Sequence, residues 1–437
     1  MTSFDATLRF RDVAAFDRDF GPGSQACDTR GSTLCSIWNP TCKGRRNIKE
    51  ERPLHSAGLS LQLITDREGF DALEQEWNDL YARAEAFSNP FLSFAWCWHW
   101  CNHFLGKGTG TELHILTGRR FGRLVMVWPM VCQRAGGMSS LTWLGAPVSQ
   151  YGDVLAEKSE PRQSLLEQGW NYLRREVPVD FIFLWKVRGD STIAPLLKRI
   201  GMRITQADCA PYADLSSAPT FSDYAKRFSS SRNKKRRRSL RQLESRGAVD
   251  HTFLYEGSEA RSLCLQILAM KRRWLFDKGI VSSALSDPRT RAFFADVAEG
   301  LDHPAGCRVV ALTCGDDVVA GEVSFASGDS VSSHIVVYND AYDRQSPGLL
   351  LTQDQLRICK EYGYQRYDFM GPCERHKLDW ADGVVELNDY ALASTLRGRL
   401  WVNGYLAWGR PRLKRLINSI PVGLRRRIAR LHAATAR

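Results

Sequence analysis

The strongest constraint on the fold is an alternation of short strand-like and helical segments that occurs twice in the same order. From Leu59 to Leu215, and again from Thr220 to Trp401, helices precede a group of short apolar strands, and a helix and a further strand follow. Period-two and period-3.6 apolar patterns support these assignments. The mixture favours an α/β (α+β) fold, and the repeated order predicts two similar modules in tandem, each a mixed twisted sheet flanked by helices.

In the first module, alternating Leu59, Leu61 and Leu63 predict an opening strand. Later segments read as helices at 70–81, 91–105, 162–176 and 193–200, and as strands at 112–117, 124–132, 141–144 and 181–185.

In the second module, Thr220 to Asp223 resembles a capping box that opens a basic helix ending at Gly247. An apolar helix stopped by Gly279 follows. Strands are expected at 308–312, 318–325, 331–338 and 367–369, with a helix from Pro347 to Gly363 before the last of them.

Four segments are therefore expected: a disordered N-terminal extension at 1–57, modules at 58–215 and 216–402, and a basic amphipathic tail at 403–437. The extension lacks hydrophobic periodicity and is expected to be dispensable for folding. Its Cys27, Cys35 and Cys42 match no close-paired zinc spacing, and no metal site is predicted for the chain.

The formal net charge of +12 is concentrated in two segments. Residues 232–246 carry eight Lys or Arg and one Glu, and residues 410–437 carry nine Lys or Arg and no acid. The rest of the chain is mildly acidic. The first segment reads either as a charged surface helix or as a binder of an anionic ligand, such as CoA phosphates, a nucleotide-sugar, RNA or an acidic polymer.

The twelve cysteines are scattered along the chain, and no secretory signal precedes them. We therefore expect them to be reduced and buried in a cytoplasmic protein. No apolar stretch reaches the ~20 residues that a membrane span needs. The tail places Leu413, Leu416, Ile417 and Ile420 among basic residues, a pattern that favours a peripheral location on an anionic membrane surface.

The run Trp96–His103 contains two Cys and two His and suggests a metal or haem site. On a helix, however, Cys97 and Cys101 share one face while His99 and His103 share a nearly opposite one. The four side chains cannot converge on one ion, so a buried aromatic helix is the preferred interpretation.

The junction between the strand at 331–338 and the following helix is the most informative segment. Backbone N–H groups at a helix start lack partners, and with the helix dipole they favour a phosphate. Pro347 suits the first helical turn, and Gly348 permits close approach of the backbone. A plain helix start is the alternative.

Several motifs in order resemble the CelD-like acetyltransferases of the GNAT superfamily. They are the segment 89–96, the basic helix ending at Gly247, the segments 342–350 and 367–371, and His376-Lys377 before Trp380. The resemblance covers roughly residues 60–400. Leu350 stands where that family has a small residue, and His376 stands where it has a Tyr.

The resemblance implies two GNAT-like modules in the Fem-type tandem arrangement, the first degenerate and the second an acetyltransferase. It implies acetyl-CoA as donor and a small-molecule or glycan acceptor, in exopolysaccharide or cellulose biosynthesis. Donor contacts would then come from the residues Val336, Val337, Arg344, Ser346, Gly348 and Leu349.

Direct N- or O-acetyl transfer needs a base for the acceptor and an acid for the leaving thiolate. Asp368, Glu322 and His376 are the candidate bases, Tyr338 is the candidate acid, and Lys377 could neutralise an acceptor carboxylate or phosphate. Three of these residues also have a structural alternative. Asp368 could be a carboxylate that caps the following loop, His376 an exposed loop residue and Tyr338 a core residue.

Two other functions stay open at this point. One is a Fem-type ligase that takes an aminoacyl group from tRNA, bound through the basic helix at 232–246. The other is a non-enzymatic adaptor, a degenerate GNAT pair at a membrane surface or polysaccharide complex.

Overall fold

A computed structural model describes residues 58–421 and 423, apart from 85–88, 107, 159 and 281. These residues all lie within one unit, Ser56–Arg437. The expectations for residues 1–57, including its three cysteines, and for the end of the tail lie outside the described residues.

The first half of the described chain begins with an alternating strand whose following helix is capped by Asp66, which accepts a hydrogen bond from the Gly69 amide. Its elements are β1 (Leu59–Ile64), α1 (Arg67–Asp71), α2 (Glu74–Arg83), the 3₁₀ turn η2 (Pro90–Leu92), α3 (Phe94–Phe104), β2 (Thr111–Leu113), β3 (Ile115–Arg120), β4 (Arg123–Trp128), β5 (Met130–Ala135), β6 (Met138–Trp143), β7 (Leu155–Ala156), α4 (Arg162–Glu176), β8 (Phe181–Arg188), α5 (Ala194–Arg199) and β9 (Arg203–Asp214).

The second half opens with the expected capping, in which Thr220 accepts a hydrogen bond from the Asp223 amide. Its elements are η3 (Leu215–Ser217), α6 (Phe221–Ala225), α7 (Ser230–Glu244), β10 (Val249–Leu254), α8 (Gly257–Asp277), α9 (Ser283–Ser286), α10 (Pro288–Glu299), β11 (Cys307–Cys314), β12 (Asp317–Ser327), β13 (Ser330–Tyr338), η4 (Asp340–Gln345), α11 (Pro347–Glu361), β14 (Arg366–Asp368), α12 (Arg375–Leu378), β15 (Gly383–Ala393), α13 (Leu396–Leu400), the π-helix η5 (Trp401–Gly409) and α14 (Arg410–Ser419).

One long sheet runs through both halves in the order β10-β11-β12-β13-β14-β9-β15-β8-β6-β5-β2. Its strands are antiparallel except at two places, β13 with β14 and β6 with β8, where each parallel pair covers three residues. A second sheet, β1-β3-β4-β7, belongs to the first half. The mixed α/β fold that the sequence predicts is confirmed.

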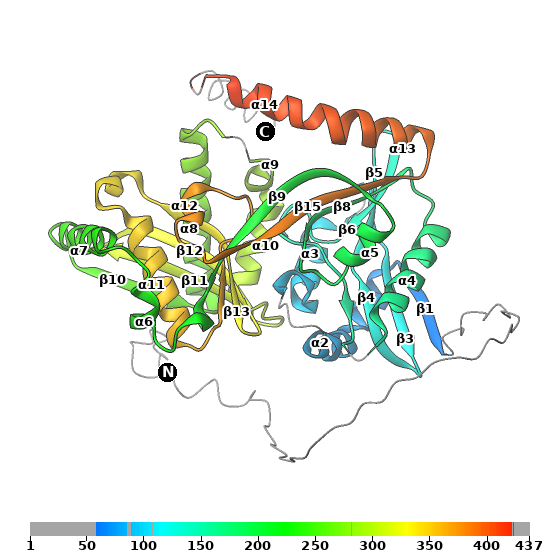
Figure 1. Ribbon diagram of the computed structural model, residues 1–437, viewed down its shortest axis with the longest axis horizontal. Coiled ribbons are helices and arrows are strands. Elements are labelled where there is room, and N and C mark those ends of the chain that lie inside the picture. The colour runs from blue at the N-terminus through cyan, green and yellow to red at the C-terminus, as the bar shows by residue number, and fades with distance from the viewer. Residues whose placement is uncertain are drawn as a thin grey trace, which may run out of the picture. The chain divides into compact units, whose positions relative to one another are not determined.

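The two halves exchange their last strands. β9 ends the first half but pairs with β14 of the second, and β15 follows β14 but pairs with β8 of the first. β9 and β15 also pair with each other, so they form the centre of the sheet between the halves (Figure 1). The segment 383–393, which the sequence assigns to the second module, therefore lies within the sheet of the first.

The strand expected at 124–132 is wrong as one element, because it divides into β4 and β5 at Pro129. Proline has no amide N–H for a ladder, and the chain passes there from the smaller sheet to the larger one. The strand expected at 112–117 divides into β2 and β3 in the same way. Pattern alone does not reveal a strand that changes sheet.

Aromatic side chains of the two halves pack against one another. Trp96 of α3 is buried, and its ring centroid lies 4.9 Å from those of Phe293 and Phe325 of the second half. α3 is thus the expected buried aromatic helix. His99 bonds the His303 carbonyl and His103 bonds Asp296, so the two histidines have separate partners.

The expectation of reduced cysteines is wrong for Cys209 and Cys373, which form a disulfide with Cα atoms 5.1 Å apart. β9 carries the first, and the loop after β14 carries the second. These segments are neighbours because of the strand exchange, which the sequence does not reveal. The seven other cysteines of the described residues are free and buried, as expected.

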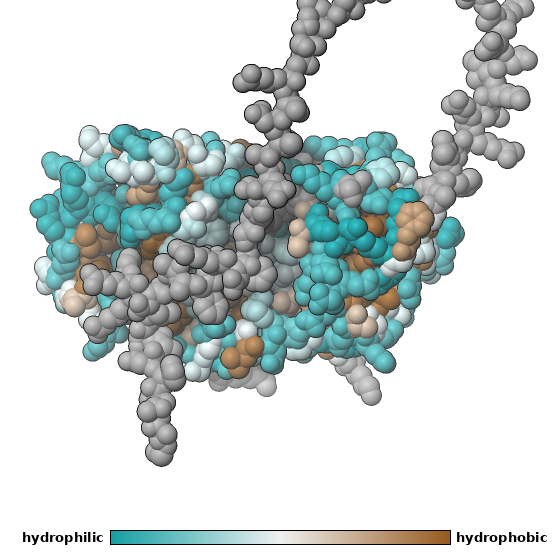
Figure 2. Space-filling view, turned by 90° about the horizontal axis from the view of Figure 1, so that it is seen from below, coloured by the Kyte–Doolittle hydropathy of each residue, from teal (hydrophilic) through white to brown (hydrophobic). Residues whose placement is uncertain are grey.

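The tail helix, formed by α13, η5 and α14, buries Val402 and Leu406 against the first half. Several large apolar side chains along it are exposed instead, namely Leu396, Leu400, Trp408, Leu413 and Leu416. No helix within the described ranges is long and apolar enough to cross a bilayer. The face opposite this helix is mostly hydrophilic, with scattered apolar residues (Figure 2).

Candidate functional site

The parting of β13 from β14 leaves a strand edge open inside the molecule. The two strands pair only from Ser330 to Ser332 on β13. Beyond that point β13 continues to Tyr338 with β12 on one side, and no strand of the described residues pairs with its other side. The amine of Lys271 on α8 donates to the Val336 carbonyl at 2.8 Å. An extended ligand can pair with main-chain groups of such an edge.

The N-terminus of α11 lies beside the end of this edge. Ser346 is left-handed (φ 47°, ψ 56°), Pro347 occupies the first turn, and no side chain caps the helix. Of the helices with ten or more residues, α3, α7 and α10 have a capping side chain, whereas α2, α4 and α8 resemble α11 in having none. In the first turn of this 15-residue helix the Leu349 amide donates to the Ser346 carbonyl at 3.0 Å, so the helix start offers the Gly348 amide and the positive end of its dipole.

Gly348 is not required by the protein itself. Its φ is not positive, and an added Cβ would lie 3.8 Å from Tyr338 Cδ1, an ordinary contact. Any need for glycine here therefore comes from a ligand.

Tyr338 stands at the end of β13 beside Trp274 of α8, with ring centroids 6.0 Å apart. The indole Nε1 of Trp274 is buried without a hydrogen-bond partner in the described part of the chain. Lys271 Nζ lies 4.7 Å from the same ring. A buried donor without a partner costs free energy, so this corner suits a ligand that carries an acceptor.

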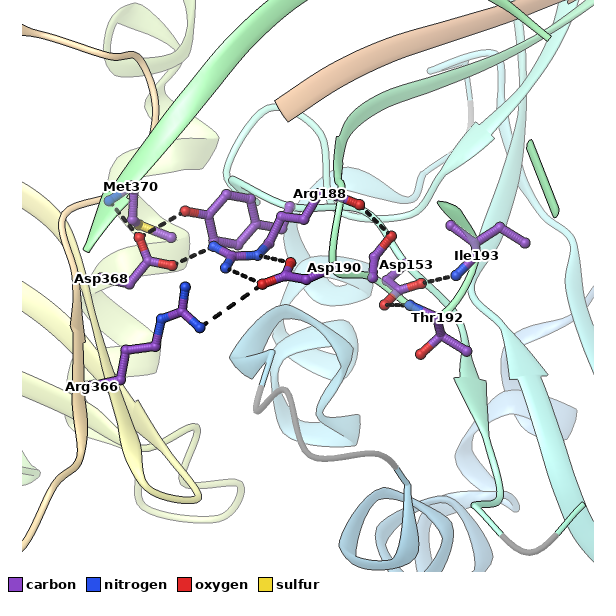
Figure 3. A network of polar contacts seen from close by, with 10 residues as sticks. Asp153, Arg188, Asp190, Thr192, Ile193, Arg366, Asp368 and Met370 are labelled. Carbon is purple, nitrogen blue, oxygen red and sulfur yellow. Dashed lines mark hydrogen bonds and ion pairs between the residues drawn. The ribbon is translucent and has the colours of Figure 1, made fainter. Parts of the chain in front are cut away.

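Asp368 lies at the end of β14 and is 1% exposed. Its carboxylate accepts hydrogen bonds from Arg188 Nη1 at 2.6 Å, Tyr151 Oη at 2.9 Å and the Met370 amide at 2.7 Å (Figure 3). Arg188, equally buried, also binds Asp190. These contacts favour the structural alternative for Asp368, since they commit the carboxylate to joining the two halves.

Glu322 is buried within the sheet of the second half. Tyr367 Oη lies 2.7 Å from both carboxylate oxygens, and burial raises the pKa of Glu322. The neighbouring Gly321 faces Ile267 of α8, so Glu322 faces the opposite side, towards α11. It is therefore separated by the sheet from Lys271 and Trp274.

α12 carries His376 and Lys377 at the other side of the open edge. His376 is 73% exposed and lies 3.7 Å from Glu374. Partial burial lowers its pKa below the ordinary value. Lys377 is largely buried and donates to the Met370 carbonyl at 3.0 Å.

The structure thus brings together most of the residues expected to bind a donor: Val336, Val337 and Tyr338 on β13, and Ser346, Gly348 and Leu349 on α11. Arg344, in η4 just before them, is exposed. Among the described residues, no group of three or more His, Cys, Asp or Glu is arranged to hold a metal ion.

Sequence reasoning missed Lys186 of β8, Lys271 of α8 and Trp274 in its role at this corner. Lys186 had a usable signal, because it is a lysine inside the apolar strand Phe181–Arg188. Lys271 had none, since it begins a basic Lys-Arg-Arg run, which in an apolar helix indicates the face turned to solvent.

The equivalent place in the first half is filled. β6 parts from β8 after three residues, as β13 parts from β14. There, however, Trp143 is buried, and its ring lies so close to Gly152 that a Cβ on that glycine would be 2.0 Å from it. Only the second half keeps the edge open beside a helix start.

Residues 230–378 match the family described as acetyltransferase (GNAT) domain. This segment contains the open edge, the start of α11 and α12. No curated protein matches the chain.

Solved structures resemble the chain at low identity. FemX is 11% identical with a TM-score of 0.52, and the match covers 79% of this chain and 99% of FemX. A protein of unknown function from Bacteroides thetaiotaomicron is 11% identical (TM-score 0.49; 76% of this chain, 100% of that one). A tandem GNAT protein from the clavulanic acid biosynthesis pathway is 11% identical (TM-score 0.43; 77% and 99%). At this identity the FemX match shows the fold and not the reaction.

The buried pair yields a stability prediction. Arg188→Met leaves the Asp368 charge buried without its ionic partner, so we expect a loss of about 3–5 kcal/mol in the free energy of unfolding. Urea denaturation measures it. Replacing both members, as Arg188→Met with Asp368→Leu, should cost less than the single change.

The matched control is Arg175→Met, which removes an exposed pair with Glu176 and should change the free energy of unfolding by less than about 0.5 kcal/mol. Equal effects of Arg188→Met and Arg175→Met would contradict a role for the buried pair in joining the halves.

Proposed function

We propose that the chain transfers an acetyl group from acetyl-CoA to an amine or hydroxyl of an acceptor. The observation that carries the proposal is the open edge of β13 beside the uncapped start of α11, within the segment that matches the GNAT family. The resemblance to CelD-like acetyltransferases makes a sugar or glycan our preferred acceptor class, in exopolysaccharide or cellulose biosynthesis.

The donor would lie along these two elements. The Gly348 amide, with Ser346 and the exposed Arg344, is placed to bind a pyrophosphate, whereas the Leu349 amide already donates to the Ser346 carbonyl. The main chain at Val336 and Val337 would pair with the pantetheine amides. Fit is supported by the space at Gly348 and by the unpartnered Trp274 indole at the same corner.

Bound acetyl-CoA would supply a thioester that an acceptor amine or hydroxyl can attack, with a thiolate as leaving group. The chain must then remove a proton from the acceptor and deliver one to sulfur. His376 suits the first task, since its lowered pKa keeps the ring neutral near pH 7. Tyr338 suits the second from its position beside Gly348. Asp368 would act as a positioning residue, because its carboxylate holds the Met370 amide at the start of the segment that leads to His376.

Gly348→Val tests the donor site. A branched side chain would occupy the approach to the α11 amides, so we expect acetyl-CoA binding to weaken by about 1–3 kcal/mol, measured by calorimetric titration. The ligand-free melt should change little, because a Cβ at this position makes only an ordinary contact.

Gly404→Val is the control, as a Cβ at this other helical glycine meets nothing within 4 Å and lies in the tail helix. Unchanged affinity in Gly348→Val would mean that the phosphates bind elsewhere and that the assignment of this corner is wrong.

Aminoacyl transfer from tRNA is the second candidate, and the face of α7 favours it. Lys234, Lys235, Arg237, Arg238 and Arg241 are all exposed there. Binding to a polyanion through them would weaken linearly with the logarithm of salt concentration. Tight, salt-sensitive tRNA binding without acetyl-CoA binding would favour this function over acetyl transfer, and no binding of either would favour the adaptor.

The tail helix supports a peripheral membrane location as part of the proposal. Leu413 and Leu416 are exposed among basic residues and no acidic residue follows Asp389 in the chain. We expect the full chain to float with liposomes that contain anionic lipid and not with neutral ones.

Leu413→Glu with Leu416→Glu should abolish that flotation. The control is Leu301→Glu, which places the same charge at a leucine of similar exposure elsewhere on the surface. Recovery that is equal on neutral and anionic vesicles, or unaffected by the double change, would refute the membrane role of the tail.

A further inference from the structure

Three lysines from distant parts of the chain gather at the junction of the halves. Lys186 comes from β8, Lys271 from α8 and Lys377 from α12. Each is largely buried but keeps some exposed surface. Hydrogen bonds connect two of them. Lys186 bonds Gln150, whose neighbour Tyr151 donates to Asp368, and Lys377 bonds Met370, whose amide donates to the same carboxylate. The charge of Lys377 also lowers the pKa of Lys186 and of Lys271.

Neutral oxygens hold all three ammonium groups. Lys186 Nζ bonds the side-chain oxygen of Gln150, Lys271 Nζ bonds the Val336 carbonyl, and Lys377 Nζ bonds the Met370 carbonyl. In the described ranges, the one carboxylate within 4.0 Å of any of them is Glu374, 3.8 Å from Lys377 and half exposed.

The other nearby carboxylates are engaged elsewhere. Asp208 Oδ1 accepts from the backbone amides of Cys209 and Cys373. Asp389 accepts from the backbone amide of Lys186 and pairs with Arg410 at 3.4 Å. Asp208, Asp368 and Asp389 therefore raise the pKa of Lys186 or of Lys377 from a distance, while their own hydrogen bonds go to other groups.

Burial disfavours the charged form of a lysine side chain and so lowers its pKa. It lowers the pKa of Lys186 and of Lys271 to about 8, and it lowers the pKa of Lys377 as well. Near pH 7 Lys186 and Lys271 are still mainly protonated, so each is a positive charge in a partly buried place. A bound anion would stabilise these charges.

The cluster lies beside the open edge. Val336, which Lys271 contacts, belongs to the stretch of β13 proposed to pair with the donor, and Met370, which Lys377 contacts, follows Asp368 at the end of β14. An acceptor that binds next to the donor would therefore have its charged groups close to these lysines.

We propose that Lys186, Lys271 and Lys377 form an anion subsite that binds a phosphate group of the acceptor. The inference rests on the proposed acetyl transfer and narrows its acceptor to phosphorylated molecules, such as a sugar phosphate. Lysine binds phosphate as a point charge, and a phosphate monoester, with up to two negative charges and three terminal oxygens, can contact several ammonium groups at once, whereas a carboxylate carries one charge.

The test uses the full chain and inorganic phosphate as the probe, with thermal melts and calorimetric titration. Phosphate should raise the melting temperature more than sodium chloride of equal ionic strength, and more than acetate. Lys186→Met and Lys377→Met should each weaken phosphate binding by about 10- to 100-fold, the loss of one charge-assisted contact. Lys235→Met, on the exposed face of α7, should have no effect.

Methionine retains the apolar length of lysine and removes its charge, so the variants should melt no lower than the parent without phosphate. Acetyl-CoA binding should survive in Lys186→Met, which separates this subsite from the donor site. Gly348→Val should keep phosphate binding and lose acetyl-CoA binding.

Phosphate stabilisation that survives in the lysine variants but disappears in Gly348→Val would overturn the proposal, since the probe would then bind at α11. Equal stabilisation by acetate would overturn the choice of phosphate. Failure of the parent to bind acetyl-CoA, with phosphate binding intact, would count against acetyl transfer and leave the anion subsite standing.

Discussion

The buried ion pair between Arg188 and Asp368 is the interaction on which the arrangement of the halves depends. Two charges that are each 1% exposed are taken out of water, and they can remain so only because nearly every polar atom is satisfied. Asp190 accepts the remaining guanidinium donors, and Tyr151 and the Met370 amide complete the shell of Asp368. Because Met370 is held in this way, the loop from Met370 to Lys377 has a fixed start, and its other anchor is the disulfide between Cys373 and Cys209.

The exchange of β9 and β15 explains why that pair is buried at all. Each strand completes the sheet of the other half, so the halves meet through a continuous hydrogen-bonded ladder and not through a surface that could separate easily. Arg188 ends β8 and Asp368 ends β14, the strands that flank this exchanged pair. A functional region at the junction can therefore draw side chains from both halves, as the lysines of β8, α8 and α12 do.

The halves share an arrangement and differ in what fills it. In both, two strands part after a parallel pairing of three residues. In the first half the buried Trp143, packed against the backbone of Gly152, fills the space beside β6. In the second, β13 runs on to Tyr338 and α11 starts beside it without a capping side chain. The asymmetry is what supports our proposal that the donor binds in the second half and not in the first.

The sequence by itself determined the element types, the tandem mixed fold and the junction at Ser346–Gly348, because periodicity, capping and turn residues act over a few positions. It left β9 and β15 unassigned and Asp368 undecided between catalysis and structure. Lys186 and Lys271 were not recognised, and the bond between Cys209 and Cys373 was not expected. Tertiary structure alone decided these points, since each depends on a partner distant in the sequence. Arg188 is the partner of Asp368, Val336 of Lys271 and Gln150 of Lys186, and the strand exchange brings Cys209 to Cys373. Burial and charge pairing are properties of the assembled sheet, and no local pattern encodes which distant residue will supply them.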